Sequence, residues 1–180
     1  MIAWRMAWKD WGFAPALFDQ AQQFLRFAEN PLQGGSQEGF IRASIVFFLM
    51  SFEAFFYELI KGFIQQNRER LAAERPKDLA KVEKQIKGTT GICDAVKDWP
   101  KLLTDGSLNP DAEAYRDFRK LTKYRNSLMH GNISEEIPGW AKLLAQDVET
   151  VRSAELARRT VSAMLEMVSS HFGVPPPDWT

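Results

Sequence analysis

The sequence predicts an all-α protein, a bundle of about five main up-and-down helices with short accessory helices. Apolar residues recur at spacings of three and four along most of the chain, and no useful stretch shows the alternation of a strand. Prolines and glycines divide the chain at intervals that suit helices. With 180 residues, 45% of them hydrophobic, we expect one domain over 1–180, with a tryptophan-rich arm at 1–13 and an extended proline-rich tail at 174–180.

The first two helices follow from apolar periodicity. The spacing of Leu17, Ala21, Phe24, Leu25 and Ala28 predicts one helix, which ends at the Asn30-Pro31 pair. A second helix is expected over residues 39–67. Its stretch from 41 to 64 is apolar enough to suggest a membrane span, but it includes four charged residues that would be costly in hydrocarbon: Arg42, Glu53, Glu58 and Lys61. We therefore expect a buried central helix and no membrane association.

Interruptions of the apolar periodicity indicate where the later helices begin and end. Residues 68–87 predict one shorter, solvated helix, and residues 92–109 predict a short helix followed by a loop. Asn109-Pro110 is typical of an N-cap followed by proline in the first turn, so a helix is expected from Asp111 to His130, ending at Gly131. Apolar positions from Val148 to Phe172 predict a last long helix.

Composition excludes several classes of protein. Lysine plus arginine and aspartate plus glutamate each total 23, so no global positive field would attract nucleic acid. The single cysteine, Cys93, excludes an intramolecular disulfide and a multi-cysteine zinc site, and it suits a cytoplasmic location. The chain has no glycine-rich phosphate loop, paired-histidine metal spacing or nucleophile elbow, so we expect neither cofactor nor metal.

The helix over 111–130 carries a local basic row. At about 100° per residue, the polar side chains fall within one stripe about 80° wide, opposite the core-facing Ala114, Phe118, Leu121 and Leu128. The stripe consists of Arg116, Arg119, Lys123, Asn126 and His130. Such a row is often only a solvated face, but this one leads to one of the chain's two histidines. The other, His171, is expected at the surface or interacting with the end of the last helix.

Arg125 lies off this row, among the core-facing positions of the same helix. A charge there requires a partner, because an unpaired buried charge costs many kcal/mol. On the second helix, Glu53 falls among apolar positions, whereas Glu58 lies on another side. We therefore predict an ion pair between Glu53 and Arg125. The pair can act only to fix the register of the two helices, or it can orient the Arg125 guanidinium so that this group also binds phosphate.

The sequence Arg125-Asn126-Ser127-Leu128-Met129-His130 resembles the motif of the HEPN domains, small helical proteins whose RNA-cleaving members carry an arginine, a polar residue, a short spacer and a histidine late in the chain. The aromatic-rich second helix with its embedded acid and the long last helix add to this likeness, which spans roughly residues 14–172 and is nearest to stand-alone prokaryotic members of defence and toxin systems. The resemblance implies a metal-independent endoribonuclease acting as a homodimer. Its active residues would be Arg125, Asn126 and His130, with Glu53 in support.

Imidazole and guanidinium suit this chemistry, since one moves protons near neutral pH and the other neutralises phosphate charge. We therefore expect RNA as the partner, with Arg116, Arg119 and Lys123 binding it, and the toxin setting allows for an antitoxin protein. The competing interpretation is a noncatalytic dimeric module in which Arg125 and His130 support the fold or bind a nucleotide.

Overall fold

Helices account for most of the chain that the structure describes. The structure, a computed structural model, describes residues 12–30, 36–88, 90–130 and 151–180, with the side chains of 128–130 outside this description. No strand occurs within these ranges. The all-α class predicted from the sequence is confirmed, whereas the expected N-terminal arm lies almost wholly outside the described residues.

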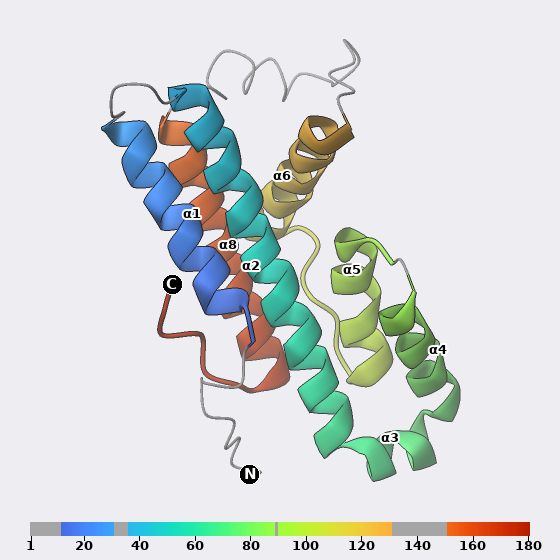
Figure 1. The fold of residues 1–180 in the computed structure, drawn as a ribbon. Coiled ribbons are helices and arrows are strands. Elements are labelled where there is room, and N and C mark those ends of the chain that lie inside the picture. The colour runs from blue at the N-terminus through green and yellow to red at the C-terminus, as the bar shows by residue number, and fades with distance from the viewer. Residues whose placement is uncertain (1–11, 31–35, 89, 131–150) are drawn as a thin grey trace.

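Three long helices form the main layer of the bundle. They are α1 (Ala14–Glu29), α2 (Gln37–Gln66) and α8 (Val151–Phe172), which lie side by side in Figure 1. α2 begins two residues earlier than expected because the Ser36 hydroxyl accepts a hydrogen bond from the backbone N–H of Gly39, an N-cap contact. Ser44, a small buried residue of α2, donates to the carbonyl of Ala21 at 2.9 Å and fixes α1 against α2.

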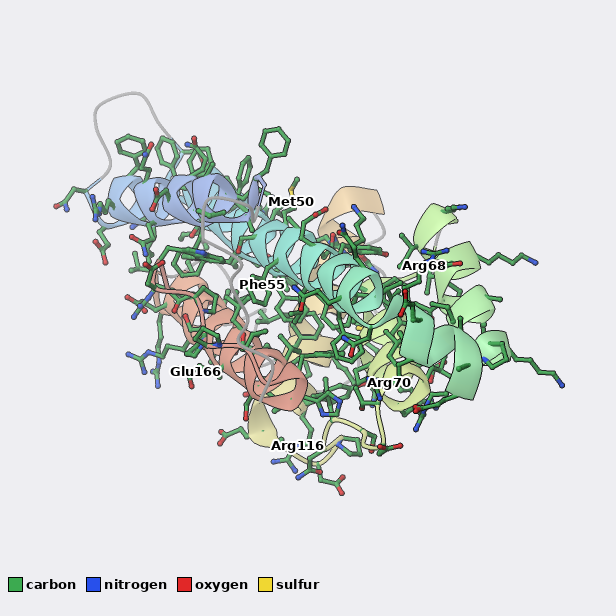
Figure 2. All side chains as sticks on the ribbon, turned by 90° about the horizontal axis from the view of Figure 1, so that it is seen from below. Met50, Phe55, Arg68, Arg70, Arg116 and Glu166 are labelled. Carbon is green, nitrogen blue, oxygen red and sulfur yellow. The ribbon has the colours of Figure 1, made fainter. Side chains whose placement is uncertain are left out.

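α2 is the centre of the core. Fourteen of its residues are buried, including Phe48, Phe52, Phe55 and Phe56. By length and composition this helix could cross a membrane, yet more than half of its most apolar window is buried inside the bundle. Phe55 points into the interior beside α8 in Figure 2, and its ring lies 6.2 Å from that of Trp179 in the tail. The expected central helix is therefore confirmed within the described chain.

The charged middle of the chain forms two helices instead of the single helix predicted. They are α3 (Arg68–Glu74) and α4 (Pro76–Lys87). Arg75 between them has φ −139° and ψ 49°, which is outside the helical region, and Pro76 opens α4. Proline disfavours a helical residue before it and is well tolerated in the first turn, so it divides the segment.

α5 (Ile92–Leu103) follows as expected, and α6 (Glu113–His130) carries the motif. The predicted start of α6 at Asp111 is wrong by two residues. The Asn109 side chain accepts a hydrogen bond from the N–H of Asp111 at 3.0 Å, and this closes a turn before the helix begins. Asparagine followed by proline suits such a turn as well as an N-cap, so the signal marks a chain reversal without fixing its type.

A glycine ends α8, the last helix of the bundle. Gly173 has φ +67°, and the N–H of Val174 donates to the carbonyl of Ser169 at 2.9 Å, as in a Schellman motif. The tail beyond is non-helical as predicted, and it brings Trp179 to 5.2 Å from the ring of Phe18.

Candidate functional site

Aromatic packing holds α6 against α2. Phe118 is 1% exposed, and its ring lies 4.5 Å from that of Phe52 on α2. Leu121 is equally buried, as predicted. Ala114 is only half-buried, however, and Tyr115 takes the core position beside it at 4% exposed. The core-facing side is thus rotated slightly from the prediction at the start of the helix.

The polar row of α6 is exposed as predicted. Arg116, Arg119, Lys123 and Asn126 all face solvent, and Figure 2 shows Arg116 projecting away from the bundle. α6 extends to His130, but the imidazole of His130 lies outside the described side chains. Gly131, which was expected to end the helix, is also outside the described residues.

The predicted ion pair between Glu53 and Arg125 is confirmed. Nη2 of Arg125 lies 2.7 Å from Oε1 of Glu53, with the two side chains 18% and 26% exposed. The two residues belong to α6 and α2, so the pair joins the motif helix to the central helix. A charge-assisted contact of this length both orients the guanidinium and compensates part of the cost of removing it from water.

One donor of the Arg125 guanidinium is not used. Its Nε is buried and has no hydrogen-bond partner among the described residues. Nη2 is directed at Glu53, and the side chain as a whole is 18% exposed, so only a small part of it is open to solvent. The group is therefore held in a fixed orientation at the edge of the core.

Two neighbours of this pair, Tyr57 and Cys93, were not predicted from the sequence to lie beside it. Tyr57, one turn after Glu53 on α2, donates from its hydroxyl to the carbonyl of Thr90 at 3.2 Å. Burial, and secondarily the negative charge of Glu53, raises the pKa of Tyr57. The four-residue spacing from Glu53 was the available signal, because residues so spaced share a helix face.

Cys93 at the start of α5 is the other neighbour. Burial raises the pKa of its thiol, while a hydrogen bond with Thr122 and the positive charges of Arg119 and Arg125 oppose that effect. It is half-buried. The thiol therefore lies near the basic groups of α6, but its raised pKa disfavours the reactive thiolate.

His171 has a structural contact that the sequence did not reveal. Its Nε2 lies 3.0 Å from the hydroxyl of Thr104, at the end of α5, and burial lowers the pKa of the imidazole. It therefore joins α8 to the segment between α5 and α6. His171 does lie in the last turn of α8, as expected, whereas its contact with Thr104 was not predicted.

An open groove lies apart from the predicted catalytic residues, and no metal-binding cluster is found in the described chain. Within the described ranges, no group of three His, Cys, Asp or Glu side chains is placed to hold a metal ion. An open groove of about 440 Å³ lies between α2 and the α3–α4 segment, away from the predicted catalytic residues. Its lining consists of Lys61, Ile64, Gln65, Arg68, Glu83, Ile86 and Lys87.

Comparisons with protein-family models, with curated proteins and with solved structures find no match for this chain.

Proposed function

We propose that the protein is a metal-independent endoribonuclease of the HEPN type. The observation that carries the proposal is the contact between Glu53 and Arg125, which fixes a guanidinium on the helix that also bears Asn126 and His130. A preoriented cation of this kind stabilises charge that develops on a phosphate during cleavage. The exposed row of Arg116, Arg119 and Lys123 on the same helix supplies phosphate contacts.

The proposed reaction is a transesterification followed by release of the leaving strand. His130 takes the proton of a ribose 2′-hydroxyl, the 2′-oxygen forms a bond to phosphorus, and the bond from phosphorus to the 5′-oxygen breaks. The histidine of a second copy donates a proton to that 5′-oxygen. Arg125 stabilises the phosphorane, and Asn126 binds the phosphate or fixes the imidazole tautomer. The products are a 2′,3′-cyclic phosphate and a 5′-hydroxyl, without oxidation or reduction.

The proposed setting is a cytoplasmic toxin–antitoxin or antiviral system, in which a homodimer acts on RNA and an antitoxin protein restrains it. The alternative is a noncatalytic dimeric module in which Arg125 and His130 support the fold or bind a nucleotide. The ion pair alone is compatible with that alternative, because partly buried pairs also set helix register.

The test compares purified wild-type protein with Arg125→Lys, Asn126→Ala and His130→Ala on total RNA in the presence of a chelator. Lysine retains the charge beside Glu53 but loses the fork of donors, so the fold is kept while cleavage falls by about a hundredfold or more. Loss of the general acid-base group in His130→Ala lowers the rate by about a hundredfold or more. Circular dichroism of each variant controls for folding, and growth after induction supplies a cellular readout.

A second substrate tests the mechanism itself. RNA with a 2′-deoxy substitution at the scissile ribose should resist cleavage, because the nucleophile is missing. Cleavage of that substrate, or cleavage by His130→Ala at the wild-type rate, would refute the proposal. Absence of any cleavage by a folded wild-type dimer would favour the noncatalytic module.

A further inference from the structure

α4 carries a row of lysines that is independent of the motif helix. Lys77, Lys81 and Lys84 are all exposed, and at 100° per residue they fall within a stripe about 60° wide. Of the acids of α4, Asp78 borders the row, about 60° from Lys81, and Glu83 lies on another side of the helix. The row itself contains no acid.

α5 connects this row to the motif helix. It lies between α4 and α6 (Figure 1), and it carries the exposed Lys97. The pKa of Asp98 on α5 is lowered by its hydrogen bond with Lys101 and further by the positive charges of Lys97 and Lys81, which places side chains of α4 and α5 near one another.

Tyr115 of α6 lies near the same part of α5. Burial raises the pKa of Tyr115, and among the smaller influences the charges of Arg119, Asp98 and Asp94 also act on it. Lys81 and Lys97 thus act on Asp98, and Asp98 and Arg119 both act on Tyr115, so these groups lie in one neighbourhood of α5. Asp98 in that region is held by Lys101 at 2.8 Å, and Asp94 lies in the first turn of α5, where the helix dipole favours an acid.

Most cations of these three helices form no ion pair within the described chain. Eight have none: one is Lys87 at the end of α4, and the other seven are Lys77, Lys81, Lys84, Lys97, Arg116, Arg119 and Lys123. Residues 68–130 hold fourteen lysines and arginines against ten aspartates and glutamates, although the whole chain is balanced. The whole chain is neutral because the net positive charge of residues 68–130 is balanced by a net negative charge on the other residues.

We propose that these seven side chains form one phosphate-binding surface, here called the α4–α6 basic surface, which binds a single RNA strand running from the motif helix across α5 to α4. The inference rests on the proposed function and specifies its substrate as an extended strand, longer than the cleaved step. α4 packs against α5, and α5 lies between α4 and α6 (Figure 1), so a strand that contacts the cations of α4 and α6 must extend well beyond the phosphate that is cleaved.

Salt dependence gives the surface a measurable signature. For single strands, each neutralised phosphate contributes about −0.7 to the slope of log K against log salt. Loss of two lysines of α4 should therefore make the slope less steep by about 1.4. Glutamine is a suitable replacement because it is uncharged and has a helix propensity close to that of lysine.

The experiment measures binding and cleavage with the full chain. The test variant is Lys81→Gln/Lys84→Gln, and the matched control is Arg26→Gln/Arg159→Gln, which removes the same charge from exposed positions of α1 and α8. Binding of a labelled RNA of about 15 nucleotides is followed by fluorescence anisotropy over a salt series, with Arg125→Lys in every protein to prevent cleavage. Cleavage of this RNA and of an RNA of about three nucleotides is measured with Arg125 intact.

The test variant should show the smaller salt slope and slower cleavage of the long RNA, with unchanged cleavage of the short one, whereas the control should behave as the parent protein. An unchanged slope in the test variant or an equal loss in the control would overturn the inference while leaving cleavage intact. If the wild type cleaves neither RNA, the proposed function fails, and the anisotropy series still decides whether the surface binds RNA.

Discussion

Glu53→Gln tests how the motif helix is held against the central helix. The charged atoms of Glu53 and Arg125 lie 2.7 Å apart, in side chains that are 26% and 18% exposed. Two unit charges about 4 Å apart attract by about 4 kcal/mol at an effective dielectric constant near 20, before the cost of desolvation. Solvent-exposed ion pairs contribute at most about 1 kcal/mol to the free energy of unfolding, whereas removing one partner of a fully buried pair lowers it by about 3–5 kcal/mol. At this intermediate burial, Glu53→Gln should lower the free energy of unfolding by about 1–2 kcal/mol.

The assay is urea unfolding of wild type, Glu53→Gln, Arg125→Gln and the double variant, which together give the coupling energy. A coupling of about 1–2 kcal/mol is expected, and each kcal/mol corresponds to about 2–4 °C in Tm for a chain of this length. The control is Glu58→Gln on the same helix. Glu58 also lies 2.7 Å from its partner, Lys61, but these side chains are 38% and 52% exposed. Its loss should cost no more than about 0.5 kcal/mol. Equal effects of Glu53→Gln and Glu58→Gln would refute the reasoning.

Three further predictions concern the core, the pH dependence and the exposed row. Phe118→Ala should lower the free energy of unfolding by about 3–5 kcal/mol in urea, because the ring is buried against Phe52 and its removal leaves a cavity. Burial lowers the pKa of His171 below 6.5, so the unfolded chain binds the proton more readily and stability falls as pH falls through 6.5. Urea titrations on either side of that pH should show this part of the dependence in wild type and not in His171→Gln. Asn126→Ala, an exposed change, should alter stability by less than about 0.5 kcal/mol, so any loss of cleavage reflects the site.

The ion pair could be predicted from sequence because it follows from rotation along two helices. Glu53 and Arg125 each fall on an apolar side of a helix whose register is fixed by many neighbours. A charge in such a position must find an opposite charge, and few candidates existed on the other core helices. The exposed row of Arg116, Arg119 and Lys123 was predictable for the same reason, since it lies opposite the core-facing residues.

Features were not predictable where a segment suits two local conformations, or where residues far apart in the sequence are in contact. The division at Pro76 and the turn at Asn109 each involve residues that suit two local conformations, and packing decides between them. The contact of His171 with Thr104 joins residues 67 apart in sequence, and no periodic pattern encodes it. The approach of Lys81 of α4 to Asp98 of α5 was not predictable either, because it depends on how the two helices pack.

A buried tryptophan of α5 contacts both α2 and α4. The ring of Trp99 stacks on that of Phe56 of α2 at 5.8 Å and 12°, and its Nε1 donates to the side-chain oxygen of Gln85 of α4 at 2.8 Å. One buried side chain thus sets α5 relative to both neighbours. Because Lys97 and the lysine row of α4 are carried on these same helices, the apolar core determines the spacing of cations at the surface. The charges of each helix alone form only a short row, and the packing of the helices joins these rows into a surface. The proposed RNA path is therefore a consequence of how the bundle packs.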